Sequence, residues 1–236
     1  MKKLFLTLIL SFSFVAINAQ EGNCLGFFPE NPGSQLISET FSADGTLLGG
    51  TIYNIDQTYD YLSGTDMQIG FAMTDSSGLQ ISNGTLNAQC IDGVFHLEMA
   101  TKAMTPEVMD MLSTDTELVG NFLDYPNVFA DEDMFGGPFE MDGGDFMIQS
   151  KKNRKNFIRV HIFNRQYEGR ESVTTPAKTF HAAKISFEFE VTKDKKTTWY
   201  KGTEWYAENA GIVRSETRTK DNKLVNYTEL TTLIVK

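Results

Sequence analysis

Cysteine is scarce in this chain of 236 residues, which has only Cys24 and Cys90. Two cysteines exclude zinc sites built from several thiolates and the dense disulfide frameworks of small secreted domains. Long apolar runs are also missing after residue 20, where no segment reaches the roughly 20 residues of a membrane-spanning helix. The chain therefore has to draw its stability from an ordinary hydrophobic core.

Basic residues are almost missing between residues 21 and 150, where Lys102 stands against 21 acidic residues. From residue 151 onward 18 Lys and Arg outnumber 10 acidic residues, so the two parts carry charges of −20 and +8. A net charge of −10 repels phosphate backbones and argues against a nucleic-acid partner. Because opposite charges attract over about 8 Å, the split predicts either complementary packing or an acidic face for a cation or basic partner.

Residues 1–19 have the organisation of a secretory signal peptide. A basic start is followed by an apolar stretch over residues 4–15 and then by the small residues Ala16 and Ala19. We expect cleavage after Ala19 and a single β-rich domain over residues 20–236. This predicts an exported protein, soluble in the periplasm or the extracellular space, with no transmembrane segment after cleavage.

The two cysteines suit that compartment. An oxidising environment favours a disulfide between Cys24 and Cys90, and the alternative is two separate buried thiols. A lipid anchor on Cys24 is a third possibility, but residues 21–23 lack the apolar-then-small run that lipid attachment needs. The prediction is a soluble protein with one disulfide.

Short runs rich in β-branched and aromatic residues, separated by turn dipeptides, dominate the mature chain. Residues 185–192 alternate between apolar and polar side chains, which is typical of a half-buried strand. Residues 211–219 and 224–235 predict a closing hairpin. Thr105 and Pro106 mark the start of one short helix near residues 105–112. The fold class predicted is mainly β, a single antiparallel β-sandwich or an open, curved β-barrel.

Several motifs occur together in a characteristic order along the mature chain. They lie at residues 169–173, 176–180, 204–207 and 210–213, and in the first part at Cys24, Phe28-Pro29, Gly33, Asp44-Gly45, Cys90, Asp92-Gly93, Tyr125-Pro126 and Asp142-Gly143. In this order the chain resembles the TapB-like family of exported bacterial proteins of unknown function. It departs from the family at Lys178, where a Pro-Ala-Gly turn is usual. The resemblance implies a single β-rich domain in the bacterial envelope and no established catalytic residues.

The family motifs supply the candidate binding residues. Arg170 and Glu171 begin one motif, and Trp205 and Tyr206 lie in another. One interpretation is a polar anchor in a ligand cavity. The alternative is a structural ion pair that closes one end of the sheet with the aromatic rings packed beside it.

An acidic stretch gives the best metal candidate. Residues 121–144 are expected to form a long surface loop, and carboxylates there suit calcium. The candidate ligands are Asp131, Asp133, Asp142 and Asp145. The match to an EF-hand loop is poor, because Phe135 stands at its fifth position, so a solvated acidic loop is the alternative. No cofactor is predicted.

Catalytic motifs are missing from the sequence, which has no HExxH, GxSxG or P-loop pattern. Seven of the ten methionines fall between residues 99 and 147, a composition that suits adaptable apolar surfaces. The function predicted is therefore non-enzymatic binding of an apolar ligand or an envelope partner. The alternatives are a structural or assembly factor that acts through surface contacts and an uncharacterised hydrolase.

Overall fold

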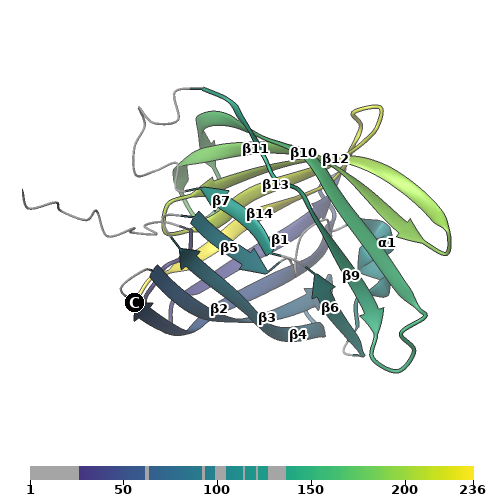
Figure 1. Cartoon of the computed structure of the whole chain (residues 1–236), viewed down its shortest axis with the longest axis horizontal. Helices are drawn as coiled ribbons and strands as arrows, with labels where there is room; N and C mark the ends of the chain where they lie inside the picture. The colour runs from purple at the N-terminus through teal and green to yellow at the C-terminus, as the bar shows by residue number, and fades with distance from the viewer. Residues whose placement is uncertain are drawn as a thin grey trace, which may run out of the picture.

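The computed structural model describes residues 27–61, 64–91, 94–98, 105–113, 115–120, 122–126 and 137–236, most of them in β-strands (Figure 1). The strands are β1 (Gln35–Ser42), β2 (Leu47–Tyr61), β3 (Gly64–Asp75), β4 (Gln80–Ile91), β5 (Val94–Glu98), β6 (Thr116–Gly120), β7 (Phe122–Pro126), β8 (Phe139–Met141), β9 (Gly144–Ser150), β10 (Phe157–Thr174), β11 (Thr179–Lys193), β12 (Lys196–Ala207), β13 (Gly211–Thr219) and β14 (Leu224–Ile234). One helix, α1 (Pro106–Met111), lies between β5 and β6 in the chain.

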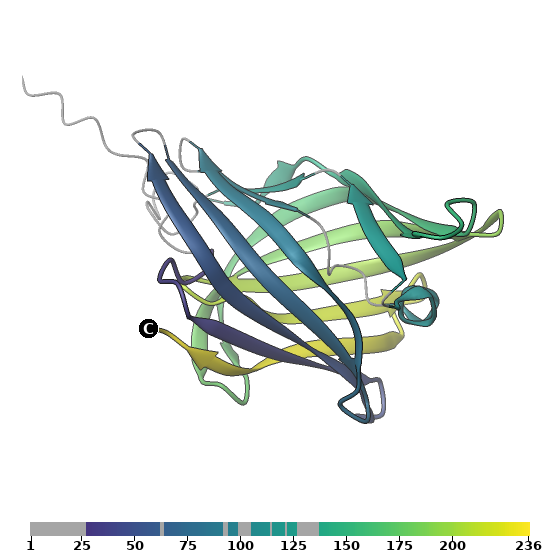
Figure 2. The same cartoon turned by 90° about the horizontal axis from the view of Figure 1, so that it is seen from below.

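All the strands belong to one antiparallel sheet that curls into a half-barrel (Figure 2). Its order is β6-β9-β10-β11-β12-β13-β14-β1-β2-β3-β4-β5-β7, with β8 paired to β10. The first and last strands, β1 and β14, pair in the middle of this order and join the acidic part of the chain to the basic part. The mainly β prediction is confirmed, in the form of the open, curved sheet and not of the sandwich.

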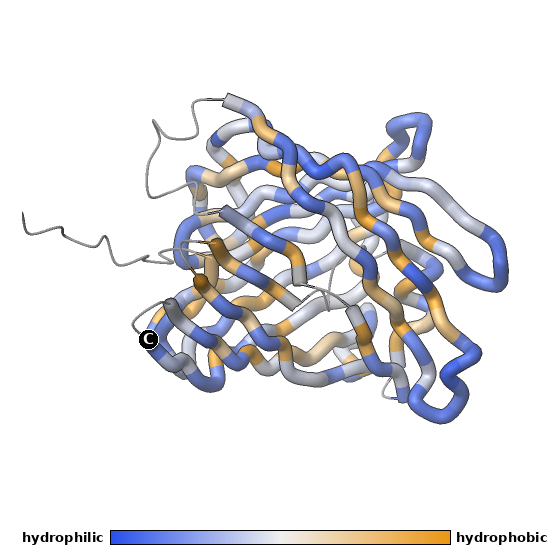
Figure 3. The backbone as a smooth tube through the Cα atoms, viewed as in Figure 1, coloured by the Kyte–Doolittle hydropathy of each residue, from blue (hydrophilic) through white to orange (hydrophobic). Residues whose placement is uncertain are grey.

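Alternation of side chains along the strands explains why these segments pair. On β10, Ile158, Val160 and Ile162 are buried, while Arg159 and His161 between them are exposed. Figure 3 shows the same alternation of apolar and polar residues along the tube, with the hairpin turns hydrophilic. Because side chains of a strand alternate between faces, one face forms the core and the other meets solvent.

The curl of the sheet comes with irregular register. Shifts occur between Thr40 and Phe41, between Ile55 and Gln57, and in β10 between residues 163 and 166 and between residues 167 and 169. Each such bulge bends its strand and increases the local twist. The sheet therefore wraps around its own apolar face.

The predicted short helix is confirmed. Thr105 Oγ1 accepts a hydrogen bond from the Val108 amide at 3.4 Å, and Pro106 occupies the first helical position. The Tyr200 hydroxyl on β12 donates to both Glu107 oxygens, at 3.0 and 2.9 Å. This contact fastens α1 to the sheet. No helix among the described residues is long and apolar enough to cross a membrane.

The contribution of the Glu107–Tyr200 contact to the free energy of unfolding should depend on pH. Burial raises the pKa of Glu107, but hydrogen bonds from its own amide and from the hydroxyls of Tyr200, Thr105 and Thr198 outweigh burial and leave the pKa below its usual 4.5. Because the folded state favours the charged form, the contribution is present at neutral pH and is lost as pH falls through the lowered pKa. We expect Tyr200→Phe to cost about 1 kcal/mol at pH 7, and the difference from wild type to shrink below pH 4.5.

Urea unfolding at pH 7 and pH 3 measures this effect. The control is Tyr61→Phe, which removes an exposed hydroxyl and should change nothing. An equal loss for Tyr200→Phe at both pH values would show that Glu107 is not the partner that matters.

The expectation of one long surface loop over residues 121–144 is wrong. Strands β7 and β8 lie within this segment, and Tyr125 of β7 is 1 % exposed. Pro and Gly residues suggested a loop, but a five-residue edge strand accommodates Pro126 at its end because no ladder donor is needed there.

Candidate functional site

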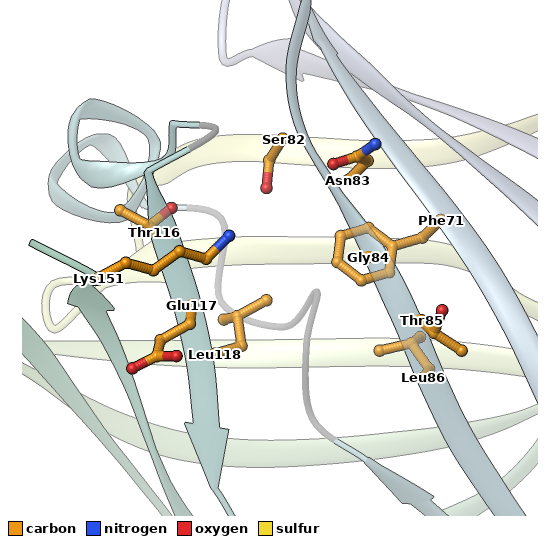
Figure 4. Close-up of a pocket in the computed structure, with 10 residues that line it drawn as sticks. All are labelled: Phe71, Ser82, Asn83, Gly84, Thr85, Leu86, Thr116, Glu117, Leu118 and Lys151. Atoms are coloured by element: carbon orange, nitrogen blue, oxygen red, sulfur yellow. The ribbon is translucent and has the colours of Figure 1, made fainter.

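A pocket of about 190 Å³ lies where β4 and β6 face each other across the curled sheet (Figure 4). Among the described strand pairs, β5 pairs only with residues 88–91 of β4, and β6 is the last strand at the opposite end of the sheet. The two strands thus approach without pairing. We call this space the β4–β6 pocket; its lining residues are Phe71, Ser82, Asn83, Gly84, Thr85, Leu86, Thr116, Glu117, Leu118 and Lys151.

The lining of the β4–β6 pocket is amphipathic. In Figure 4 Ser82, Asn83 and the Lys151 ammonium lie toward one end, and Leu86 and Leu118 lie toward the other together with Thr85 and Glu117. The Phe71 ring covers Gly84, where a Cβ would come within 2.8 Å of the ring, so this flat apolar wall depends on glycine. An apolar wall with a few convergent polar groups is the usual composition of a small-molecule site.

Ser82 is the pocket residue whose burial and hydrogen bonding are the most informative. It is 4 % exposed, and its hydroxyl has no hydrogen-bond partner among the described residues. Every fully buried polar side-chain atom of those residues does have a partner, so the Ser82 oxygen opens into the pocket, as Figure 4 shows. The hydroxyl is thus accessible from the pocket and can donate a hydrogen bond to, or accept one from, a molecule bound there.

Lys151 of the pocket lining belongs to a short run of basic residues. The turn after β9, residues 151–155, which we call the basic turn, carries four Lys and Arg residues. Lys152 pairs with Asp115 at 2.7 Å, and Arg154 lies 3.7 Å from Glu117. Two of the four cationic side chains of the basic turn thus lie beside carboxylates of residues 115–117.

A cluster of aromatic side chains, separate from the β4–β6 pocket, stabilises the curl of the sheet. The Phe27 ring lies 4.6 Å from Phe95 on β5, 4.5 Å from Tyr125 on β7 and 5.4 Å from Tyr206 on β12, measured between centroids. Because β5 and β7 form one end of the sheet and β12 lies near its middle, these rings join strands that do not pair. Such contacts add about 0.5–1.5 kcal/mol each beyond the buried area.

A buried arginine reinforces this closure. Arg165 on β10 is 1 % exposed and donates to the main-chain carbonyls of Asp142, at 2.7 Å, and Asp124, at 3.2 Å. Its guanidinium lies 4.9 Å from the centroid of Tyr125, whose hydroxyl donates to the buried Glu204 at 3.2 Å. Burial lowers the pKa of Arg165, and the charges of Glu204 and Asp124 oppose that shift. Arg165 therefore ties the end strand β7 to β10 through polar contacts.

Comparison with known proteins identifies a family and two crystal structures to which this chain is similar. A family model described as DUF3108-like matches residues 31–230. The chain belongs to the DUF3108-like family. Two crystal structures are similar over 89 % of this chain and 99 % of their own, each with a TM-score of 0.82. One is a Bacteroides fragilis protein described as exported with a YmcC-like fold, 31 % identical, and the other a Parabacteroides distasonis protein described as a lipoprotein, 32 % identical. A search of curated proteins finds no match.

In this DUF3108-like chain the predicted binding residues divide between the two faces of the sheet. Trp205 Nε1 donates to Glu171 Oε1 on one face, where Lys184 and Arg214 each lie 5.9 Å from the tryptophan ring. Tyr206 points to the opposite face and joins the aromatic cluster. Trp205 is thus held within a charged ladder of side chains.

Arg170 belongs to the face of Tyr206. The register pairs Arg170 with Ala183 and Ala183 with Tyr206, which places the three on one side of the sheet. Burial raises the pKa of Tyr206, and the charges of Arg165 and Arg170 oppose this rise. Arg170 and Glu171 therefore lie on opposite faces of the sheet, and their role in ligand binding stays a prediction.

The described acidic residues of the calcium candidate have protein partners. The Asp145 carboxylate accepts from Arg159 at 2.8 Å and lies 3.1 Å from His161 Nδ1, both on β10. Asp142 offers its main-chain carbonyl to Arg165. At this point the charge split is complementarity between the neighbouring strands β9 and β10.

Other predicted residues lie outside the described part of the chain. Asp131 and Asp133 are among them, and within the described residues no group of three or more His, Cys, Asp or Glu could hold a metal ion. The calcium site therefore stays a prediction. Cys90 is buried on β4, but Cys24 lies outside the described residues, and the disulfide also stays a prediction.

The sequence alone did not identify Ser82, Lys151 or Arg165 as site residues. Ser82 lies in a polar stretch without a motif, and its burial depends on which face of β4 turns inward. The basic turn around Lys151 was visible as a run of charge, but nothing in the sequence placed it beside residues 82–86.

Proposed function

We propose that this chain is an exported, non-enzymatic binding protein of the bacterial envelope that holds a small amphipathic ligand in the β4–β6 pocket. The observation that supports this most is Ser82, a nearly buried residue whose hydroxyl opens into the pocket and has no hydrogen-bond partner among the described residues. Export is supported by the two structural relatives, described as an exported protein and a lipoprotein. The signal peptide over residues 1–19, the single domain over residues 20–236 and the narrower TapB-like assignment stay predictions.

The size of the pocket limits the ligand. The β4–β6 pocket has a volume of about 190 Å³. That is smaller than the pockets of about 300–1,000 Å³ that enclose drug-sized ligands. The ligand, or the part of it that enters, is thus a polar head with a few carbon atoms.

Filling the pocket should abolish binding without harming the fold. We expect Ser82→Leu to weaken binding of hexanoate and of hexanol at least 10-fold, because the added side chain occupies the ligand's space. The melting temperature should not fall, since the change fills an existing cavity. Ligand-observed NMR measures binding, and native mass spectrometry of the purified protein shows whether small molecules co-purify.

The matched control is Ser172→Leu, the same change at an exposed position of β10 outside the pocket lining. It should bind as wild type does. If wild type binds neither probe and carries no small molecule, the proposed function is wrong. A co-purifying protein in place of a small molecule would instead favour the assembly-factor alternative.

A further inference from the structure

We infer that one end of the sheet, formed by the β11–β12 and β13–β14 turns, docks on the surface of a bilayer rich in anionic phospholipids. We call residues 193–196 and 220–223 the lysine turns. None of these residues lines the β4–β6 pocket, so this surface has a role that does not depend on the proposed ligand site.

The lysine turns lie at the same end of the molecule. Strands β11, β12, β13 and β14 are neighbours in the sheet and each is antiparallel to the next, so every second turn lies at the same end. Figure 1 shows both turns at the right, away from the C-terminus at the left. The β10–β11 and β12–β13 turns, residues 175–178 and 208–210, lie at the other end and carry one lysine and one glutamate. Positive charge is therefore concentrated at one end of these strands.

The lysines of these turns are mostly exposed. The lysine turns contain five lysines and two aspartates, which gives them a net charge of +3. None of the five lysines has a carboxylate partner among the described residues, unlike Lys152 and Lys184. The five are Lys193, Lys195, Lys196, Lys220 and Lys223, of which all but Lys193 are exposed. An anionic surface within about 8 Å therefore meets a positive field.

The backbone of the β11–β12 turn favours glycine at a position that lysine occupies. Lys193 pairs with Lys196, so the loop has two residues, and both have positive φ, 50° at Asp194 and 67° at Lys195. Aspartate suits the first position of such a type I′ turn, whereas the second prefers glycine, because a Cβ is crowded in this conformation. Backbone strain of this kind clusters at functional sites. The strain here points to a function of the Lys195 side chain at the tip of the hairpin.

Lysine and tryptophan together favour a lipid surface over an acidic protein. Lysine is depleted in protein–protein interfaces, whereas clustered lysines bind anionic lipid head groups, with each residue worth roughly fivefold in affinity. Trp199 on β12 is half-buried, and the ammonium groups of Lys220 and Lys201 lie 5.4 Å and 6.0 Å from its ring centroid. Tryptophan is enriched at the boundary between lipid and water. The ring and the lysine turns thus match the chemistry of that boundary.

The charge of the whole chain favours one orientation on the bilayer. With a net charge of −10, the chain as a whole is repelled by anionic lipid. The β1–β2 and β3–β4 turns, which carry aspartates, lie at the bottom of Figure 2, whereas the β11–β12 turn lies at its right-hand edge. A docked molecule therefore turns the lysine turns toward the lipid and the acidic turns away from it.

Vesicle binding, measured by co-sedimentation, tests the lysine turns. We expect wild type to bind vesicles made of equal parts phosphatidylglycerol and phosphatidylcholine at least about 10-fold more tightly than vesicles of phosphatidylcholine alone. Lys195→Gln combined with Lys196→Gln should weaken binding to the anionic vesicles at least about 10-fold. Raising the salt from about 0.1 M to about 1 M should abolish binding, since the Debye length falls from about 10 Å to about 3 Å.

The matched control is Lys178→Gln combined with Lys236→Gln, which removes two exposed lysines at the opposite end of the sheet. It should change binding less than about twofold, because these charges lie beyond a Debye length from the lipid. All variants share one N-terminus, so any lipid affinity of that segment is common to them. Equal losses in the two double variants, or equal binding to both kinds of vesicle, would overturn the inference.

Lys195→Gly separates the charge of the turn from its folding. It should weaken vesicle binding about fivefold and yet raise the melting temperature, because glycine relieves the backbone strain. Wild-type binding by this variant would exclude the hairpin tip from the docking surface.

Fluorescence locates the contact, because the chain has only two tryptophans. Trp205 lies six residues beyond Trp199 on β12, which is roughly 20 Å farther from the lysine turns. Energy transfer to a dansyl-labelled head group should therefore come mainly from Trp199, and Trp199→Phe should remove most of it while the protein stays bound. Undiminished transfer in Trp199→Phe would place another surface against the lipid.

An acidic protein is the other class of partner. If anionic vesicles do not bind but polyglutamate does, the lysine turns recognise an acidic chain and the bilayer is wrong. If neither binds, the docking surface itself is wrong. Both results leave the hexanoate and hexanol measurements on the β4–β6 pocket unaffected.

Discussion

Arg165→Met is expected to destabilise the fold by about 3–5 kcal/mol, because it removes the positive member of a buried set of charged groups. The change removes the Arg165 donor from the Asp142 and Asp124 carbonyls and removes a positive charge that interacts with the buried Glu204. For a chain of this size the corresponding fall in Tm is about 10 °C. Urea unfolding followed by fluorescence gives the free energy, and a thermal melt gives the Tm.

Two variants make this prediction specific. Arg159→Met removes an arginine of the same strand that is exposed and paired with Asp145, so it should cost less than about 1 kcal/mol. Adding Glu204→Gln to Arg165→Met should recover at least about 1 kcal/mol, since the buried negative charge that Arg165 opposed disappears while the acceptor for Tyr125 remains. Similar losses for Arg159→Met and Arg165→Met would contradict the importance of the buried charge.

Gly202→Ala is expected to destabilise by about 3 kcal/mol, at the upper end of the usual cost of overpacking. Gly202 on β12 pairs with Phe187 on β11, and a Cβ on Gly202 would lie 2.2 Å from the Phe187 ring. The ring is buried and has little freedom to move aside. Glycine is needed here for close approach and not for an unusual backbone angle.

A double-mutant cycle tests that steric cause. Phe187→Leu alone leaves a small cavity, but in the Gly202→Ala background it makes room for the new methyl group. The double variant should therefore lose less unfolding free energy than the sum of the two single variants. The control is Gly137→Ala, where a Cβ meets no atom of the described residues within 4 Å and stability should not change. Additive losses in the cycle would show that the Phe187 ring is not what excludes the methyl group.

Sequence reasoning succeeded where a strand carries its own signal. The alternation in β10 and β11, the closing hairpin of β13 and β14, and the cap and first turn of α1 are local patterns, and all are confirmed. It failed where the signal is weak or comes from distant residues. Strand β7 is five residues long and ends in Pro126, and only its packing under the aromatic cluster makes it a strand of the core.

Arg165 shows why the site was harder to predict than the fold. The buried positions Ile158, Val160 and Ile162 continue in phase to residue 164, which predicts Arg165 outside. A register shift between Phe163 and Gln166 reverses the phase, so Arg165 and Tyr167 point inward. A bulge depends on pairing with neighbouring strands, so it cannot be recognised from the sequence of one strand alone.

The sequence by itself determined the β class, the single short helix, the main strand faces and the uneven charge, because propensity, alternation and composition are local properties of the chain. The tertiary structure decided that the sheet curls and that β1 pairs with β14. It also decided that Asp145 is met by basic residues of β10 and that Ser82 and Lys151 share one pocket. The physical reason is that strand register and twist, which bring residues distant in sequence together, are set by packing of the whole sheet and not by any one strand.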